Sequence, residues 1–517
     1  MEMAKHSAEV VVAGLKKILI SEKDGLDQEV QGKVEKLIAE LQGTRPPPPP
    51  CDPDAQRIED GFDFFKKNIY DQHPDYFREL AEGQHPRFLV FSCSDSRVSP
   101  SVVLNFKPGE AFSGRNIANM VPQFDQLRHT EIGSVIEYAV KALEVKNILV
   151  MGHSRCGGIE RLMKLPDESV TYDFIDQWVQ IGLPAKLKVL AVANDLTFEE
   201  QCRLCEKVSV KNSMANLLTY PFVRNAVVSG TLTLRGVEDV YRANASNAYA
   251  LLTIFASVEM AKQSAEVVVE GLKRILIREK EGLDREVQGK VERLIAELQG
   301  KRPSFDPDAQ RIEDGFAFFK ENIYDKYPEC FSELAEGQHP RFLVFACSDS
   351  RVSPSVVLNF KPGEAFSGRN IANMVPPFDQ LRHTEIGSVI EYAVKALEVQ
   401  NILVVGHSRC GGIERLMKLP DESHTFDFID QWVQIGLPAK IKVLEEANDL
   451  PFEEQCRLCE KVSVKNSMAN LLTYPFVRNA VVSGTLTLRG GYYDFVNGTF
   501  EQWKMCTEPM PPKPMPF

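Results

Sequence analysis

Two short runs of residues in this chain combine metal-ligand, acidic and basic side chains. The first is Cys93-Ser94-Asp95-Ser96-Arg97, and the second is His153-Ser154-Arg155-Cys156-Gly157-Gly158. Each run follows an apolar stretch typical of a strand, residues 87–91 and 147–151. We therefore expect Cys93 and His153 just past the carboxyl ends of two strands, at the edge of an open α/β sheet where ligands bind.

Two cysteines and one histidine at that edge are three zinc ligands with a fourth position left open, which is the pattern of a catalytic zinc site. Zinc lowers the pKa of a bound water and supplies hydroxide near neutral pH. Two thiolates cancel the charge of the ion, and a neutral centre should acidify its bound water less. We therefore expect activity to rise at alkaline pH. An isolated cysteine after a strand is usually a core residue, and His-x-x-Cys alone is a weak signal. The two runs together are far more specific.

Asp95 and Arg97 follow Cys93 at intervals of two residues, so all three would project to the same side of an extended loop. An ion pair between Asp95 and Arg97 would keep the carboxylate ionised. Asp95 would then either accept a hydrogen bond from the zinc-bound water or occupy the fourth position itself. The helix predicted to begin at Gly157 directs backbone N–H groups to the same place, which suits an anion.

The second half of the chain repeats the first almost completely. The candidate metal ligands and the Asp–Arg pair recur in the second half. Their second-copy positions are Cys347, Asp349, Arg351, His407 and Cys410, which correspond to Cys93, Asp95, Arg97, His153 and Cys156. We predict an N-terminal helical arm at residues 1–45, a first domain at 52–236, a linker at 237–258, a second helical arm at 259–302 and a second domain at 306–505. The arms either pack on their own domain or reach over the neighbouring one.

Strand and helix patterns alternate within each domain, which predicts an α/β fold with a mostly parallel sheet flanked by helices. Helical patterns cover residues 54–81, 129–144, 159–163, 173–180, 184–194 and 197–219. Further strands are predicted at 111–113 and 226–234. The second copy continues with a predicted strand and turn at 490–503, whereas residues 237–258 of the first copy are unrelated to it.

The composition restricts the class of partner. A net charge of −12 without a basic stripe argues against a nucleic-acid or anionic-membrane partner. The longest strongly apolar run, residues 248–256, is too short to span a bilayer. An odd number of cysteines, 11, and the lack of a signal-type N-terminus predict a cytoplasmic protein, or one of the chloroplast stroma if a transit peptide is missing.

Other polar candidates carry weaker signals. The pair Cys202 and Cys205, with Cys456 and Cys459, fits packed thiols better than redox pairs or zinc ligands. Structural or surface roles are also favoured over ligation or proton transfer for His85, His129, His339 and His383. Cys51, Cys330 and Cys506 have no counterpart in the other copy and are interpreted as incidental.

The motifs taken together resemble a tandem duplication of the plant-type β-class carbonic anhydrase. The resemblance covers nearly all of both halves and rests on Glu82 to Gln84, Cys93 to Val98, Pro108 to Phe112, Arg115 to Asn119, Ile136 to Val140, His153 to Gly158 and Asn216 to Val223. It implies reversible hydration of CO2 to bicarbonate and a proton by attack of zinc-bound hydroxide. The alternatives are hydrolysis of a CO2 analogue such as CS2 or COS, and a zinc-stabilised binding protein without enzymatic activity.

The resemblance also implies a role for individual residues. Zinc would be bound by Cys93, His153 and Cys156, and again by Cys347, His407 and Cys410, with the dyads Asp95–Arg97 and Asp349–Arg351 beside it. Gln84 and Gln338 would hydrogen-bond CO2 or bicarbonate, and Gly157 and Gly411 would offer a backbone N–H. The apolar pocket would be lined by Phe112, Ile117 and Tyr138, with Phe366, Ile371 and Tyr392.

In that family the glutamine and the aromatic residues come from a partner subunit. Here the partner would be the other half of the same chain, in an intramolecular pseudo-dimer that leaves room for further homo-oligomerisation. The first copy lacks the terminal strand that the family uses for higher assembly. Ser113-Gly114 and Arg155 depart from the family pattern near the pocket, where larger residues and alanine are common.

Overall fold

The computed structural model describes residues 52–126, 129–166, 171–237, 252–253, 306–380, 384–420 and 425–505. The predicted helical arms, Cys51, Cys506, His383 and most of the predicted linker lie outside these residues. The chain divides into two compact units, Met1–Glu59 and Asp60–Phe517, and the sheet and both copies of the motif belong to the second unit.

The elements of the two repeats correspond one to one through most of their length. The first repeat contains α3 (Pro53–Phe65), α4 (Pro74–Glu82), β1 (Phe88–Cys93), α5 (Pro100–Val103), β2 (Ala111–Asn116), α6 (Thr130–Glu137), β3 (Asn147–Met151), α7 (Gly157–Lys164), α8 (Ile175–Val179), α9 (Leu183–Val192), α10 (Phe198–Leu217), α11 (Pro221–Val228), β4 (Thr233–Val237) and β5 (Leu252–Thr253). The second contains α14 (Pro307–Phe319), α15 (Pro328–Glu336), β6 (Phe342–Cys347), α16 (Pro354–Val357), β7 (Ala365–Asn370), α17 (Thr384–Glu391), β8 (Asn401–His407), α18 (Gly411–Lys418), α19 (Ile429–Val433), α20 (Leu437–Ala447), α21 (Phe452–Leu471), α22 (Pro475–Val482), β9 (Thr487–Asp494) and β10 (Thr499–Lys504).

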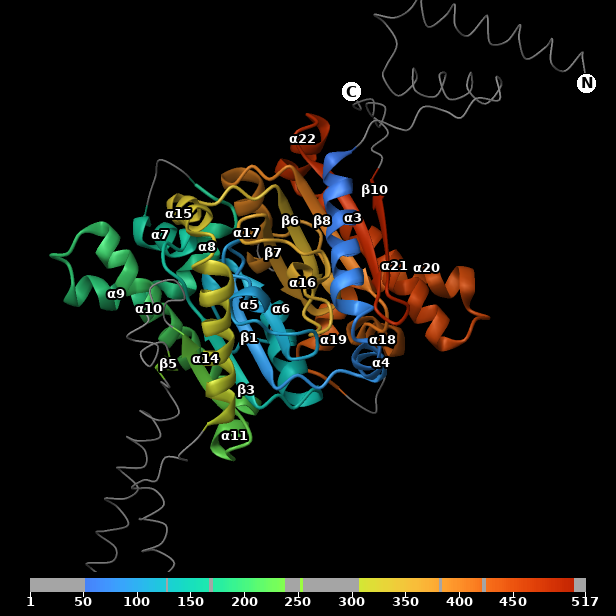
Figure 1. Cartoon of the computed structure of the whole chain (residues 1–517), viewed down its shortest axis with the longest axis horizontal. Coiled ribbons are helices and arrows are strands. Elements are labelled where there is room, and N and C mark those ends of the chain that lie inside the picture. Colours follow the sequence, from blue (N-terminus) through green and yellow to red (C-terminus); the bar gives the residue numbers. More distant parts are fainter. Residues whose placement is uncertain are drawn as a thin grey trace, which may run out of the picture. The chain divides into compact units, whose positions relative to one another are not determined.

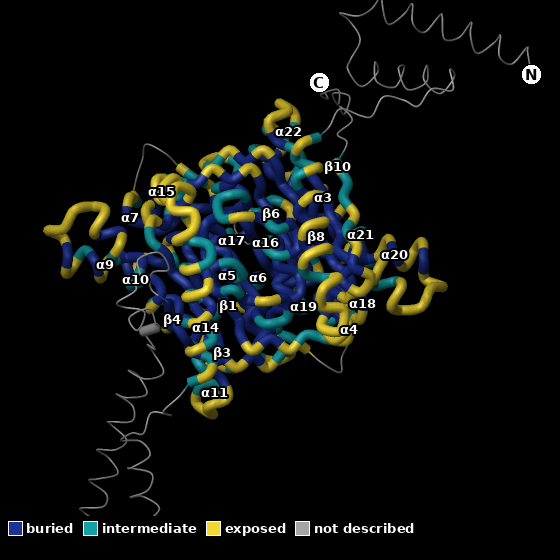
Figure 2. Tube along the Cα trace, in the orientation of Figure 1, coloured by how far each residue is buried: buried dark blue, intermediate teal, exposed yellow. Residues whose placement is uncertain are grey.

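The predicted α/β architecture is confirmed, with two mostly parallel sheets that join into one. The ten strands follow the order β10-β9-β8-β6-β7-β2-β1-β3-β4-β5. Strands β1 to β4 pair in parallel, as do β6 to β9, and the repeats meet where β2 and β7 pair antiparallel at Arg115 and Arg369. Strands β1, β2, β3, β6, β7 and β8 form the buried centre, β10 at one edge is partly exposed, and the outer faces of the surrounding helices are exposed (Figure 2). The two repeats therefore form the expected pseudo-dimer around a continuous sheet.

The predicted strand at 226–234 is wrong over its first residues. Helix α11 includes residues 226–228, and β4 begins only at Thr233. Pro221 at the start of the helix presets a helical φ, and Gly230 at φ +74° ends the helical stretch. The apolar Val-Val pair that indicated a strand therefore lies in a helix, since short apolar runs do not distinguish the two structures.

The two ends of the sheet differ, as the sequence predicted. Strands β9 and β10 form an antiparallel hairpin at the end of the second repeat. In the first repeat the corresponding position holds only the two-residue strand β5, paired antiparallel with β4. The predicted long helix at 54–81 is divided into α3, a π-helical turn and α4, and the helix at 129–144 changes to a π-helix at Tyr138.

Helices are exchanged between the repeats. The yellow helix α14 of the second repeat lies over the blue and green part of the first (Figure 1). Its Arg311 side chain donates to the backbone oxygens of Leu104 at 3.2 Å and Asn105 at 2.8 Å. A Cβ at Gly315 would lie 2.0 Å from the Leu104 oxygen, so only glycine permits this approach. In return, Phe62 of the first repeat stacks on Phe500 in the final hairpin, with ring centroids 5.4 Å apart.

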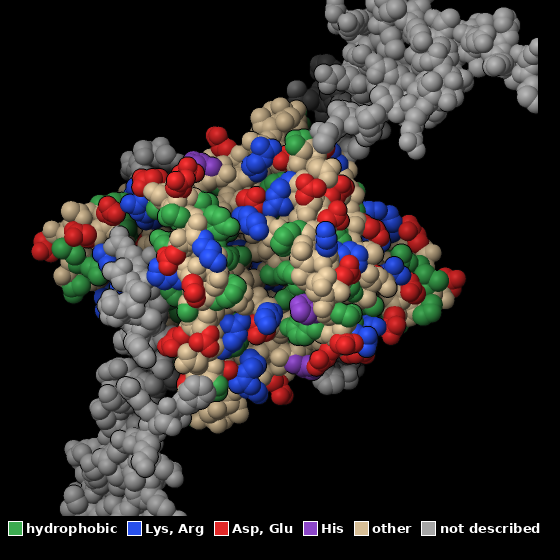
Figure 3. Space-filling view, in the orientation of Figure 1, with side chains coloured by type: hydrophobic (Ala, Val, Ile, Leu, Met, Phe, Trp, Pro, Cys, Tyr) green, Lys and Arg blue, Asp and Glu red, His purple; other side chains and the backbone are tan. Residues whose placement is uncertain are grey.

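The surface carries charges of both signs. On the face in Figure 3, acidic and basic side chains are interspersed over both repeats. No helix in the described parts of the chain is both long and apolar enough to cross a membrane.

Candidate metal centre

Each repeat brings two thiols and one imidazole together in its interior. The first metal group consists of Cys93, His153 and Cys156, and the second of Cys347, His407 and Cys410; within each group the donor atoms lie within 4.8 Å of one another. Cys93 is the last residue of β1, His153 lies two residues beyond β3, and Cys156 caps the N-terminus of α7. The parallel pairing of β1 with β3 thus places all three at one sheet edge, as predicted.

The donor set fits zinc. His153 Nδ1 lies 3.0 Å from the Ser154 oxygen, an arrangement that assigns the proton to Nδ1 and leaves Nε2 with its lone pair. His153 Nε2 is buried and has no hydrogen-bond partner in the part of the chain that the structure describes. The Cys93 and Cys156 sulfur atoms lie 4.0 Å apart. Two sulfurs and a buried imidazole nitrogen without a partner are the ligand atoms of a Cys2His zinc site.

Electrostatics favours a shared negative charge on the two sulfurs. Burial raises the pKa of the Cys93 thiol, but the hydrogen bond with Cys156 and the charge of His153 outweigh burial and hold that pKa well below its usual range. The same hydrogen bond, together with burial, raises the pKa of Cys156. Burial lowers the pKa of His153, but the charge of Cys93 reverses this and raises it to about 9. A bound cation would take the place of these protons, so zinc binding should release them.

The Asp–Arg dyads form as expected. Arg97 donates from Nε to Asp95 Oδ1 at 2.8 Å and from a terminal nitrogen to Oδ2 at 2.6 Å, and Arg351 holds Asp349 in the same bidentate manner. Burial raises the pKa of Asp95, but the hydrogen bonds from Arg97 outweigh burial and lower it, so the carboxylate is ionised. Neither aspartate belongs to the groups of clustered donor atoms. Of the two roles left open by the sequence, this geometry corresponds to the hydrogen-bond acceptor.

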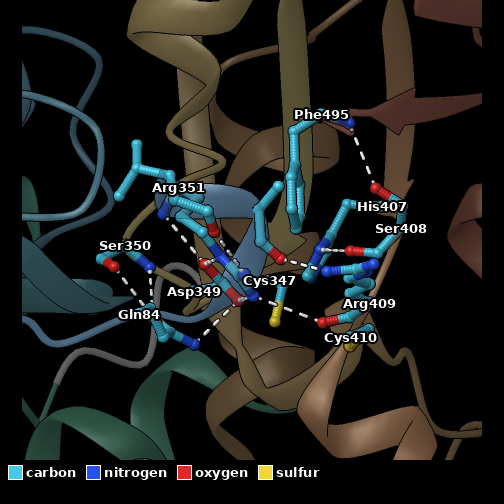
Figure 4. A network of polar contacts seen from close by, with 12 residues as sticks. Gln84, Cys347, Asp349, Ser350, Arg351, His407, Ser408, Arg409, Cys410 and Phe495 are labelled. Carbon is cyan, nitrogen blue, oxygen red and sulfur yellow. Dashed lines mark hydrogen bonds and ion pairs between the residues drawn. The ribbon is translucent and has the colours of Figure 1, made fainter. Parts of the chain in front are cut away.

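A glutamine from the opposite repeat completes each dyad. Gln338 Nε2 donates to Asp95 Oδ2 at 2.8 Å, and its Oε1 accepts from the Ser96 backbone at 2.9 Å and hydroxyl at 2.8 Å. Gln84 makes the equivalent contacts with Asp349 and Ser350 (Figure 4). The expected exchange of glutamines between repeats is therefore observed. Each amide contacts a carboxylate, and substrate binding by the second N–H of Nε2 stays a prediction.

The aromatic residues also cross between the repeats. The Tyr392 ring stacks on Phe366 with centroids 5.7 Å apart, and its hydroxyl would lie 2.0 Å from a Cβ at Gly157. Tyr138 and Phe112 are arranged in the same way against Gly411. Ile117 instead contacts Gly158 of its own repeat, and Ile371 contacts Gly412. The predicted apolar residues thus meet at each centre, four of the six from the opposite repeat.

A cavity opens at each metal group. The one at the first group has a volume of about 780 Å³ and is lined by Arg97, Cys156, Gly157, Gln338 and Tyr392, among others. The one at the second group, about 880 Å³, has the corresponding lining and in addition Asp494, Val496 and Asn497 from the final hairpin. Both cavities therefore lie between residues of the two repeats.

Several residues at the site were given no role by the sequence, although Arg115 lies in one of the motifs that carry the resemblance. Arg115 donates to the backbone oxygens of Cys93 at 3.0 Å and Asp95 at 2.6 Å, which fixes the loop that carries the dyad. Glu206 on α10 accepts from the Cys156 backbone N–H at 3.0 Å. In the second repeat the Arg351 guanidinium lies 4.3 Å from the ring centroid of Phe495, next to His407 (Figure 4). The partners of these residues are not their neighbours in the sequence. The need of a buried charged side chain for a partner is the only signal that could have indicated such contacts.

The weaker candidates lie apart from the metal groups. Cys202 and Cys205 are free thiols on α10, and burial raises their pKa values to about 11 and about 12. His129 packs edge-on against Trp178 with centroids 6.1 Å apart. His85 and His339 line the cavities at the second and first metal groups, respectively, without belonging to a metal group.

Comparison with known proteins agrees with this arrangement. A protein-family model described as carbonic anhydrase matches residues 88–245 and 342–500. β-Carbonic anhydrase 3 of Arabidopsis thaliana is 47% identical over 246 residues, which are 47% of this chain and 95% of that protein. Among solved structures, the β-carbonic anhydrase CcaA is 29% identical, with a TM-score of 0.37, over 39% of this chain and 93% of its own. A tetrameric β-carbonic anhydrase of Sordaria macrospora is 28% identical, with a TM-score of 0.34, over 38% of this chain and 97% of its own. Because the two matches to the family model span more than half of the chain, it belongs to the carbonic anhydrase family, as an enzyme that carries two β-class copies in tandem.

Proposed function

We propose that this chain catalyses the reversible hydration of CO2 to bicarbonate and a proton, with one zinc ion held by each metal group. The observation that carries the proposal is the buried Cys-His-Cys set beside an ionised aspartate, repeated in both halves. Zinc bound there would act as the Lewis acid that makes water a nucleophile near neutral pH. The chain's own residues supply orientation and charge.

The dyad has a defined task in this scheme. Asp95 is only 1% exposed, and Arg97 and Gln338 hold its carboxylate through hydrogen bonds to both oxygens. An ionised acceptor fixed in this way can orient the attacking water without rearranging, which is the benefit of a preorganised site. Arg97 balances the carboxylate charge, so the acceptor stays ionised inside the protein.

Apolar side chains lie next to the first metal group. Tyr392 lines the cavity and stacks on Phe366, and Ile117 packs against Gly158 in the first turn of α7. The binding of an uncharged linear molecule is favoured by such apolar surface, and the second N–H of Gln338 offers one polar contact.

The test is metal content measured together with the rate of CO2 hydration, for the natural chain and for Cys93→Ser and Cys347→Ser separately. We expect two zinc ions per natural chain, one in each variant, and about half of the activity in each variant, because each group serves its own centre. A direct comparison of CO2 with CS2 turnover distinguishes the hydrolase alternative. An unchanged CO2 hydration rate after complete removal of zinc would refute the proposal.

A further inference from the structure

The end of one helix places each glutamine. Helix α15 of the second repeat ends at Glu336, two residues before Gln338, and α4 of the first repeat ends at Glu82, two residues before Gln84. The last carbonyl groups of a helix have no partner within the helix and need donors from elsewhere. Whatever binds these carbonyls therefore fixes the direction in which the glutamine leaves the helix.

Two arginines of the opposite repeat bind these carbonyls. Arg97 donates to the Leu334 oxygen at 2.9 Å, and Arg155 donates to the Ala335 oxygen. The same pattern recurs at the second centre, where Arg351 donates to the Leu80 oxygen at 3.1 Å and Arg409 to the Ala81 oxygen. A cation at a helix C-terminus is also favoured by the helix dipole. The helix end is thus attached to the metal-binding loop of the other repeat.

Arg155 occupies an unusual place in that loop. It lies between Ser154, whose oxygen contacts His153 Nδ1, and the metal ligand Cys156. Its φ of +52° is a left-handed conformation that side chains other than glycine disfavour, and Arg409 repeats it at +50°. The Arg155 oxygen accepts from Arg97 at 3.1 Å. A single residue therefore contacts the dyad through its backbone and the opposite repeat through its side chain.

The ion pairs of this arginine are secondary. Its terminal nitrogens lie 3.6 Å from Glu336 and 3.9 Å from Glu199, and the side chains of these glutamates are 84% and 75% exposed. Pairs as exposed as these contribute little, because water and salt screen them. Among the contacts of the Arg155 side chain, the one with the Ala335 oxygen is therefore the one that orders the segment leading to Gln338.

We propose that Arg155 and Arg409 are positioning residues, each holding the helix end that sets the opposite repeat's glutamine against the Asp–Arg dyad. This inference rests on the proposed function for its kinetic consequence, but the ordering of the helix end does not depend on that function. It also makes each centre sensitive to the pairing of the repeats. A change that separates the helix end from Arg155 would slow the first centre without touching a metal ligand.

The kinetic test uses the Cys347→Ser chain, in which only the first centre is expected to work. Arg155→Ala should lower kcat/KM about tenfold, the loss expected for a hydrogen bond to a charged group. Arg155→Lys should recover part of the loss, since lysine keeps one charged donor. The matched control is Arg224→Ala, because Arg224 is an exposed arginine on α11 of the same repeat and lines neither cavity.

A double-mutant cycle separates positioning from general damage. In a chain that already carries Gln338→Ala, Arg155→Ala should cost little further activity, because both changes remove the same contact with Asp95. A full tenfold loss in that background would overturn the proposal. So would an effect of Arg155→Ala no larger than that of Arg224→Ala.

Hydrogen–deuterium exchange gives a readout that does not need activity. Arg155→Ala should speed exchange at the backbone amides of residues 335–338, whereas Arg224→Ala should not. Residues 80–86 and 334–340 are identical, so peptides containing Ser332 rather than Arg78 must be followed. Faster exchange in a zinc-loaded chain without CO2 hydration would refute the proposed function and support the positioning role. Unchanged exchange would refute the positioning role alone.

Discussion

Two glutamates are buried at the junction of the repeats without enough hydrogen-bond donors. Glu131 Oε1 accepts from Asn370 at 3.2 Å, and Glu385 Oε1 accepts from Asn116 at 3.2 Å. The second carboxylate oxygen of each glutamate, and the side-chain oxygen of each asparagine, is buried with no hydrogen-bond partner among the described residues. A proton on a carboxyl group would supply one of the missing donors.

The direction of the pKa shifts agrees with this shortage. Burial raises the pKa of Glu131 to about 8, and burial together with the charge of Glu131 raises that of Glu385 well above its usual value. The folded chain thus keeps protons that the unfolded chain releases near pH 4.5, the ordinary value for glutamate. The resulting stability is fully present below that unfolded value and is lost as pH rises toward 8.

We predict that Glu131→Gln removes much of this pH dependence. A group that stays protonated only in the folded state lowers the unfolding free energy by about 1.4 kcal/mol per pH unit, so by about 2 kcal/mol between pH 6 and 8, since the proton is half released at pH 8. Glutamine cannot ionise, and its amide offers donors to the unpaired oxygens. Over this interval the melting temperature of the natural chain should therefore fall by roughly 2–4 °C relative to that of the variant.

The assay is thermal unfolding of the zinc-loaded chains from pH 6 to 9, followed by fluorescence or calorimetry. Glu445→Gln, a change at an exposed position on α20, is the control for the loss of a negative charge. The reasoning fails if the difference between Glu131→Gln and the natural chain is the same at pH 6 and pH 9. It also fails if Glu445→Gln reproduces the pH-dependent gain.

Three further outcomes follow from the exchange of residues between repeats. Gln338→Ala removes the contact with Asp95 and should lower kcat/KM of the first centre about 10- to 100-fold. A chain with only the first metal group should therefore lose most of its CO2 hydration activity in stopped-flow assays. Equal losses at both centres would contradict the assignment. Gly411→Ala should disable the second centre, because its Cβ would lie 2.0 Å from the Tyr138 hydroxyl; retained activity in a chain with only the second metal group would show that the tyrosine moves without cost. A chain reduced to residues 52–236 should hydrate CO2 only as a dimer, because its glutamine and tyrosine serve the partner's centre. A chain that is monomeric by analytical ultracentrifugation and still active would contradict this prediction.

The metal ligands and the dyads could be predicted from the sequence because the interactions that place them are local. Asp95 and Arg97 are two residues apart, and the hydrogen bonds between them are those expected from their spacing. Cys93 and His153 follow apolar runs that could be recognised as strands, and parallel strands bring their carboxyl ends to one edge. The exchange of glutamines and aromatic residues was predicted only through the resemblance to a family.

Tertiary structure alone decided how the repeats use one another. Three sets of contacts join residues that lie 180 or more positions apart in the sequence. They are the pairing of β2 with β7, the packing of α14 on the first repeat, and the hydrogen bond from Arg155 to the Ala335 oxygen. Periodicity within one helix or strand carries no information about such partners, since it reports only which face is apolar. The sequence by itself determined which atoms can hold zinc and that there are two such sets. The packing of one repeat on the other decided that neither centre is complete without the opposite half, because the helix ends that carry Gln84 and Gln338 find their donors only there.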